Sequence, residues 1–221
     1  MFNVTRLAEV PECLSRGNQY NHQQVVSSLK TMFFEKCYLC ERNDIQDVEV
    51  EHFNPQQAGG GRTDWNNLYY SCSRCNSLKS NTHTKLLDCT DANIDIFRKI
   101  RLVMTVAPDD DVLVEATDKN PCEQTQNTVR LLNECYNSTN TALRGVSREA
   151  LIEQIYEYMI AFMNARNLLK KPSTGRTIKQ GAMETIEAML NVTHPFSAFW
   201  RWQYLHDSFL TEHYSNLENG F

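Results

Sequence analysis

Four cysteines in two Cys-x-x-Cys pairs are the residues of this sequence best suited to chemistry. Cys37 and Cys40 form the first pair, and Cys72 and Cys75 form the second. Two intervening residues let both thiolates of a pair reach one tetrahedral Zn²⁺, and two pairs complete a site with four cysteine ligands. Because four thiolates leave no open position for a reactive water, the predicted zinc is structural.

A second group of polar residues, between and just after these cysteines, could perform catalysis. Glu51 precedes His52, and Asn76 follows the last cysteine of the zinc set. A neutral imidazole accepts a proton from water near physiological pH. The carboxylate of Glu51 and the amide oxygen of Asn76 are hard ligands suited to Mg²⁺ or Mn²⁺. Such a cation beside a phosphodiester would stabilise the developing charge while His52 activates water.

Short elements must hold these side chains. Residues 45–53, IQDVEVEHF, alternate apolar and polar side chains and predict a strand with His52 near its end. Pro55 and three glycines predict a loop over 54–63. The apolar residues 68–70, which lead into Cys72, are predicted to form a strand or a helical turn. Helices are predicted over 22–36 and 76–87.

The motifs CYLCE, VEHFNP and DWNNLYYSCSRCNSLKSN together resemble the HNH (ββα-metal) endonuclease family, in the subset with a zinc held by four cysteines. The resemblance implies that His52 is the general base and that Asn67 braces the loop between the strands. It also implies that Glu51 and Asn76 bind the catalytic cation. Asn76 stands where many members have histidine, so the chain is similar to an H-N-N variant of the family.

Three further segments resemble the PtuB-type HNH proteins of Septu anti-phage systems, which also occur beside some retrons. These segments are EHFNP, TVRLLNECYNSTNTALRGVSRE and HPFSAFWRW. The resemblance implies an antiviral effector nuclease that acts in a hetero-oligomer with an ABC/SMC-like ATPase of the PtuA type. Two alternatives stay open: an RNase, for example one that cleaves tRNA, and a non-catalytic zinc-stabilised module that binds nucleic acid or protein.

The charge of the chain bears on how it would hold such a substrate. The net charge is −5, whereas affinity for nucleic acid depends on clustered Lys and Arg. We therefore expect a local basic patch, a partner that supplies binding, or both. The candidate phosphate contacts near the site are Arg62, Arg74 and Lys79, with Lys85 slightly farther along the chain.

The predicted fold class is α+β, with a zinc-stapled ββα-metal module in a mainly α-helical chain. Residues 1–120 are expected to hold the module, after a loosely structured lead-in over 1–23. Residues 121–221 are expected to form a helical scaffold and partner-docking region. Strands are predicted over 94–106 and 112–116, on either side of an acidic turn, and helices over 125–135, 141–170, 176–190 and from Pro195 onward.

The remaining composition indicates the compartment. The other four cysteines are expected to be small, partly buried apolar residues: Cys13, Cys89, Cys122 and Cys135. The sequence has no apolar run of about 20 residues that could span a membrane, and its N-terminus lacks the pattern of a secretory signal. We therefore expect a cytoplasmic protein with reduced cysteines.

Overall fold

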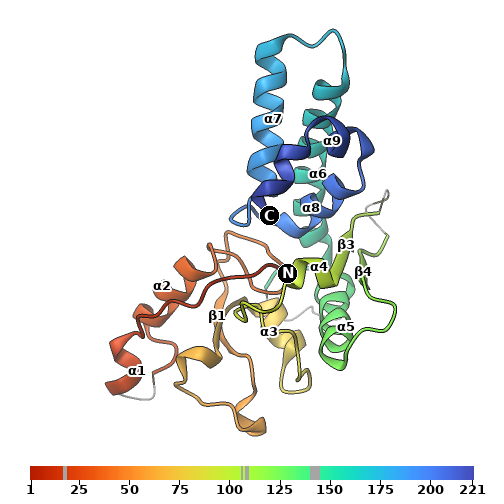
Figure 1. The fold of residues 1–221 in the computed structure, drawn as a ribbon. Coiled ribbons are helices and arrows are strands. Elements are labelled where there is room, and N and C mark those ends of the chain that lie inside the picture. The colour runs from red at the N-terminus through yellow and green to blue at the C-terminus, as the bar shows by residue number, and fades with distance from the viewer. Residues whose placement is uncertain (17–18, 106, 108–109, 140–144) are drawn as a thin grey trace.

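Figure 1 shows a lower body, which contains the N-terminal and middle elements, and a pair of long helices that extends away from it. These helices are α6 (Arg148–Lys170) and α7 (Arg176–Leu190). Within the described ranges, the strands form two small antiparallel sheets among many helices, which confirms the predicted α+β class. The computed structural model describes residues 1–16, 19–105, 107, 110–139 and 145–221.

The first sheet is a hairpin that leads directly into a helix. β1 (Val48–His52) pairs with β2 (Leu68–Cys72), and α3 (Ser73–Lys79) follows without a break. His52 lies opposite Leu68 in the register. The hairpin therefore places the end of β1 next to the start of β2, and the order β-β-α is the one predicted for the module.

Two predicted helices end earlier than expected, because positive backbone φ angles follow them. The helix predicted over 76–87 is α3, which ends before Ser80 at φ 45°. The helix predicted over 22–36 is α2 (Gln23–Met32). A residue with a positive φ angle cannot continue a right-handed α-helix, which requires φ near −60°. The two residues with positive φ that follow α2 are Phe34 and Glu35.

The second sheet lies in the middle of the chain. β3 (Ile100–Val103) pairs with β4 (Leu113–Ala116). The strand predicted over 94–106 is wrong in its first part, which forms the helical turn α4 (Ile96–Lys99). Asp95 caps this turn by accepting the N–H of Arg98 at 3.1 Å, so a local side-chain contact overrides the β-branched composition. Part of the predicted acidic turn lies outside the described residues.

Helices make up most of the C-terminal half, as predicted. α6 begins only after Ser147, whose hydroxyl accepts the N–H of Ala150 at 3.2 Å; part of the segment predicted before it lies outside the described residues. No helix of the described ranges is both long and apolar enough to cross a membrane. The remaining helices are α1 (Glu12–Arg16), α5 (Glu123–Asn137), α8 (Ser197–Leu205) and α9 (Ser208–His213), and short 3-10 turns lie at Gln56–Ala58, Trp65–Asn67 and Ser215–Gly220.

A buried ionic network joins the two halves of the chain. Glu41 accepts hydrogen bonds from Lys36 Nζ at 3.3 Å and from the hydroxyl of Ser197 at 2.9 Å. It also forms an ion pair with the amino group of Met1 at 2.9 Å. Burial alone would raise the pKa of Glu41, but these two cations lower it to about 2. The charge of Glu41 therefore ties the start of the chain and the N-terminus of α8 to the first cysteine turn.

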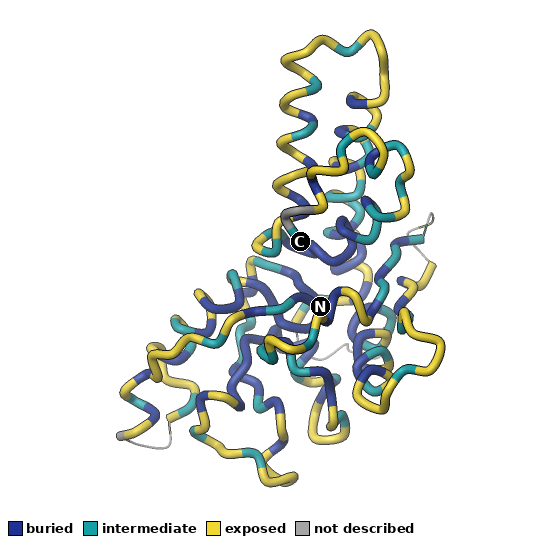
Figure 2. Tube along the Cα trace, in the orientation of Figure 1, coloured by how far each residue is buried: buried dark blue, intermediate teal, exposed yellow. Residues whose placement is uncertain are grey.

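The lead-in over 1–23 is held more firmly at its start than predicted. Met1 and Phe2 are buried, and the N–H of Val4 donates to the carbonyl oxygen of Cys89 at 2.9 Å. One cluster of buried apolar side chains extends from this segment through both predicted parts of the chain. Figure 2 shows this buried region in the middle of the molecule and exposed residues along much of α6 and α7.

Candidate active site

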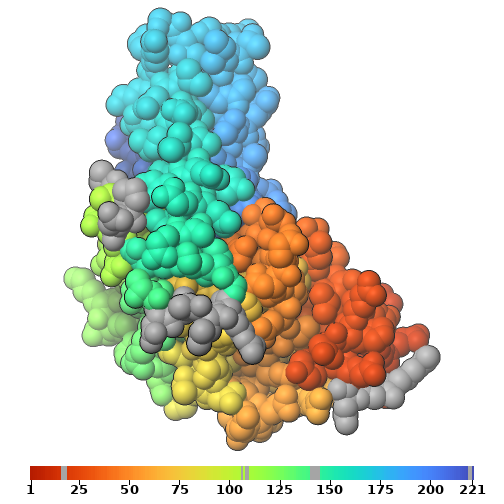
Figure 3. Space-filling model, turned by 180° about the vertical axis from the view of Figure 1, so that it is seen from behind, coloured from red at the N-terminus to blue at the C-terminus, as the bar shows by residue number. Residues whose placement is uncertain are grey.

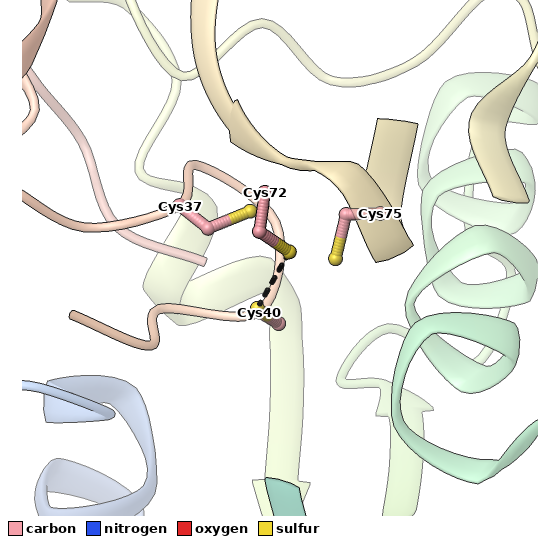
Figure 4. Close-up of side chains that lie close together, drawn as sticks. All are labelled: Cys37, Cys40, Cys72 and Cys75. Atoms are coloured by element: carbon pink, nitrogen blue, oxygen red, sulfur yellow. Dashed lines mark hydrogen bonds between the residues drawn. The ribbon is translucent and has the colours of Figure 1, made fainter. Parts of the chain in front are cut away.

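The four predicted zinc ligands lie together in the interior. Cys37 and Cys40 come from the turn after α2, Cys72 ends β2, and Cys75 lies in the first turn of α3 (Figure 4). Their Sγ atoms all lie within 4.8 Å of one another, and all four residues are buried. Four Zn–S bonds of about 2.3 Å in a tetrahedron separate sulfurs by about 3.8 Å. The distance of 3.9 Å between the Sγ atoms of Cys40 and Cys72 matches this value, and the limit of 4.8 Å for the whole set leaves only a small contraction for a bound zinc ion.

The protonation of the cluster is consistent with metal binding. All eight cysteines of the chain are free thiols. Burial raises the pKa of Cys40, because a thiolate without a cation loses hydration there. Burial also acts on Cys37, but hydrogen bonds from the other three thiols lower its pKa well below the ordinary value. A divalent cation would replace these shared protons and stabilise all four thiolates.

His52 lies at the edge of a cavity of about 320 Å³ beside the hairpin. Its Nε2 is 3.0 Å from the carbonyl oxygen of Arg62. A carbonyl oxygen only accepts, whereas the Gln56 amide nitrogen, 3.4 Å from the same Nε2, only donates. The shorter contact, with the Arg62 carbonyl oxygen, favours a proton on Nε2 and leaves Nδ1 as the acceptor nitrogen. The ring also packs edge-on against Tyr20, with centroids 4.6 Å apart. The imidazole is therefore oriented, with one nitrogen available to accept a proton.

Glu51 is placed next to a buried cation rather than open to solvent. Lys79 Nζ, from α3, lies 2.6 Å from Glu51 Oε1 and 3.0 Å from the carbonyl oxygen of His52. Burial raises the pKa of Glu51, and its attraction to Lys79 opposes this shift. Lys79 thus contacts both catalytic candidates of β1, the side chain of Glu51 and the backbone of His52. Since its side chain is fully buried, its predicted role as a phosphate contact does not fit its position.

Glu49 and Asn76 complete the polar wall of the cavity. The side-chain amide of Asn76 donates to a carboxylate oxygen of Glu49. Glu49 lies two residues before Glu51, so both carboxylates leave the same face of β1. The cavity lining includes Glu49, Glu51 and Asn76, which are three oxygen-bearing groups suited to one hydrated divalent cation. The predicted ligand pair therefore gains a third candidate.

Asn67 connects β2 to the loop that follows β1. Its Oδ1 accepts the N–H of Asn54 at 2.7 Å, and its Nδ2 donates to the carbonyl oxygens of Asn54 at 3.0 Å and Gly61 at 3.2 Å. A Cβ at Gly60 would lie 1.8 Å from the Asn54 carbonyl oxygen, so this approach requires glycine. The contacts of Asn67 are those of a loop brace, and they hold the segment that carries the Arg62 carbonyl.

The other predicted phosphate contacts differ in where they point. Arg74 is fully buried, and its guanidinium donates to the carbonyl oxygens of Cys135 at 2.9 Å and Ser138 at 2.7 Å. It therefore braces α5 and does not face the cavity. Lys85 is exposed but forms an ion pair with Glu123 at 2.8 Å. Arg62 is exposed in the loop beside His52, and its guanidinium lies 5.4 Å from the Tyr20 ring centroid.

The residues of the cavity that were not predicted include two that bear on its chemistry, Glu49 and Tyr20. Glu49 could have been found, because the alternation in VEVEH places it on the same strand face as Glu51. Tyr20 could not, because it lies in the lead-in and meets His52 only through the tertiary fold. The scattered cysteines mostly follow the prediction: Cys89 and Cys135 are buried and Cys13 is partly buried, whereas Cys122 is exposed.

Comparison with known proteins identifies one region of the chain. Residues 37–82 match the family model described as HNH endonuclease. The matched segment, here called the HNH region, begins at the first zinc-ligand candidate and ends just after α3. It includes every predicted catalytic residue. No curated protein and no solved structure matches the chain.

Proposed function

We propose that this protein is a metal-dependent endonuclease that hydrolyses phosphodiester bonds of nucleic acid. The observation that carries the proposal is the placement of His52 beside Glu49, Glu51 and Asn76 in one cavity within the HNH region. His52 has an oriented ring and a nitrogen that can accept a proton. The three neighbouring side chains offer oxygen ligands at the same cavity, so a base and a cation site lie together.

In the proposed reaction, the residues of the cavity have separate roles as base and as metal ligands. His52 Nδ1 takes a proton from the attacking water, while the Arg62 carbonyl oxygen keeps the ring in place. Glu51 and Asn76, together with Glu49, would hold Mg²⁺ or Mn²⁺, which supplies Lewis-acid stabilisation of charge on the phosphate and the departing oxygen. The zinc at the four cysteines is structural in this scheme, because its ligand set is closed.

The test is cleavage by a His52→Ala variant with Mg²⁺ or Mn²⁺ on labelled DNA and RNA. Loss of the base should lower the rate about 10²–10⁴-fold. His213→Ala is the matched control, because His213 is an exposed histidine of α9 outside the cavity lining. Equal cleavage by His52→Ala and the wild-type protein would exclude His52 as the base. Absence of cleavage on both substrates by the wild-type protein and its partner complex would favour a binding module instead.

The finer proposal is an antiviral role with an ABC/SMC-like ATPase of the PtuA type. It is supported by the resemblance of three segments to PtuB-type proteins and by the small number of cations that face the cavity. An ATPase that itself binds nucleic acid would supply the positive charge that the cavity lacks. Co-expression with the ATPase of an adjacent gene should yield one co-eluting complex that cleaves phage or host nucleic acid. Separate elution at micromolar concentrations would exclude this partnership.

A further inference from the structure

The positive charge of the chain is concentrated in one projecting element. Residues 158–183, here called the basic arm, comprise the second part of α6, the connecting loop and the first part of α7. No carboxylate occurs in this segment, and its five cations are Arg166, Lys170, Lys171, Arg176 and Lys179. Because the whole chain has a net charge of −5 and the arm carries +5, the residues outside the arm together carry −10. This separation of charge gives the molecule one positive end.

Three of these cations have no partner within the described part of the chain. Lys171 and Arg176 are exposed, Lys179 is partly exposed, and no described carboxylate or carbonyl group pairs with their side chains. The other two are engaged near α9. Arg166 forms an ion pair with Asp207 at 2.6 Å, and Lys170 Nζ lies 5.8 Å from the Phe209 ring centroid.

The shape of the arm presents these cations to solvent. Figures 1 and 3 show α6 and α7 projecting side by side beyond the rest of the molecule, and the two helices pack against each other along their length. Their connection lies at the far end of the projection and, with the helix residue on either side of it, has the sequence KKPSTGR. Lysine, arginine, serine and threonine are among the side chains that contact phosphate oxygens in protein–nucleic acid complexes.

Among the described residues, no lysine or arginine lines the cavity, and Arg62, in the loop beside His52, is an exposed cation close to it. Glu49 and Glu51 line it, and Arg74 and Lys79 are buried and internally paired. A polyanionic substrate therefore meets carboxylates at the site of cleavage and needs neutralisation elsewhere on the protein. The arm is the part of the described chain where unpaired cations gather without any acidic neighbour in sequence.

We propose that the basic arm binds the phosphate backbone of nucleic acid at a distance from the cleavage site. The inference rests on the proposed function for the class of ligand, and it adds a second contact region. The part of α6 within the arm, residues 158–170, has 13 residues and is about 20 Å long, which corresponds to about 6 base pairs of duplex. Long substrates reach both the cavity and the arm, whereas short oligonucleotides reach one of them.

The experiment compares two triple variants by fluorescence anisotropy in a His52→Ala background, where cleavage is about 10²–10⁴-fold slower than in the wild-type protein. The arm variant is Lys171→Gln, Arg176→Gln and Lys179→Gln. The matched control removes three exposed cations outside the arm: Lys99→Gln, Lys119→Gln and Arg130→Gln. The probes are a 40-base-pair DNA duplex, a 40-nucleotide RNA and an 8-nucleotide oligomer, each titrated at several salt concentrations. Thermal unfolding monitors whether both variants remain folded.

The arm variant should bind the long probes at least about 10-fold more weakly. Its slope of log affinity against log salt should fall by about 2–3, as expected for three lost phosphate contacts. The control should change affinity for every probe less than about 2-fold. The 8-nucleotide oligomer, which spans fewer phosphate contacts, should show a smaller loss in the arm variant than the long probes do. Unchanged affinity and slope for the arm variant would overturn the proposal, as would an equal loss in the control.

Two other outcomes would assign the arm to a different occupant and overturn the proposal. Ile160, Leu168 and Ile178 are exposed apolar residues of the arm, so a protein surface is the competing occupant. Loss of self-association in light scattering, with nucleic-acid binding intact, would identify a second copy. Loss of ATPase co-elution alone would identify the partner protein. Because binding is measured without cleavage, failure of the arm leaves the His52 test unaffected, and the reverse also holds.

Discussion

The HNH region and the basic arm use charged side chains in opposite ways. In the HNH region, Arg74, Lys79 and Glu51 are buried and bonded to the protein's own groups. In the arm, Lys171 and Arg176 face solvent and have no internal partner among the described residues. A buried charge is stable only when it is paired, so its position is determined by the fold. An exposed charge contributes little to the fold and is available to a ligand.

The two regions also differ in how they are stabilised. The HNH region consists of short elements around four cysteines, whose metal would contribute folding energy directly. The arm consists of two long helices that pack against each other. Because sheets of two strands are marginal by themselves, we expect the first region to depend on a metal and on the buried ionic network more than the second region does. Three predictions test this difference.

The largest effect is expected for loss of the zinc site. Apparent zinc-binding energies in small structural sites are about 10–16 kcal/mol, which is comparable to the whole stability of a domain. Cys75→Ser should therefore leave the HNH region unfolded. Elemental analysis should find one zinc per wild-type chain and little in the variant, and circular dichroism should show the lost structure. Cys122→Ser, at an exposed cysteine, is the control. A folded, fully active Cys75→Ser protein would contradict the assignment.

A smaller effect is expected for the buried ionic network. Glu41→Gln leaves Lys36 and the Met1 amino group without their carboxylate in the interior. Breaking one partner of such a buried pair costs about 3–5 kcal/mol. Glu35→Gln removes an exposed carboxylate that lies 3.4 Å from Lys30, and it should cost less than about 1 kcal/mol. Urea denaturation of both variants measures the difference, and equal losses would show that burial does not decide the effect.

The smallest effects are expected for two glycines, and they should have opposite signs. Gly60→Ala brings a Cβ to 1.8 Å from the Asn54 carbonyl oxygen, so it should destabilise by about 1–3 kcal/mol and slow cleavage by displacing the loop. Gly181→Ala, in α7, meets no atom within 4 Å and should stabilise by about 0.5–1 kcal/mol. Thermal unfolding and cleavage assays measure both changes. Stabilisation by Gly60→Ala would contradict the close approach of the loop.

The sequence predicted the local features of the site because their signals lie within a few residues. The spacing of the cysteine pairs indicated one metal site, and alternation in VEVEH indicated the strand that holds His52. The long helices were predicted from their apolar periodicity. The ends of elements were predicted less well, because single backbone angles at Ser80 and single caps such as Asp95 decided them.

Contacts between distant parts of the chain were not predictable in this way. Arg74 and Lys79 are basic residues near the motif, and only the packing of α3 against β1 and α5 shows that they point inward. Tyr20 meets His52 across the fold, and Glu41 meets Ser197 over a separation of 156 residues. Burial and pairing depend on which elements become neighbours, and residue type alone does not specify this.

By itself, the sequence determined the chemistry that the chain can carry: four thiols for one metal, a histidine next to a carboxylate, and a helical segment without acidic residues. These properties follow from side-chain types and short spacings. The tertiary structure alone decided which groups are free to act. It left Nδ1 of His52 as an acceptor, brought Tyr20 against His52, and turned Lys79 toward Glu51. The physical reason is that a buried charge loses its hydration and is stable only when it is paired. The cations of the projecting arm keep their hydration and need no partner within the protein.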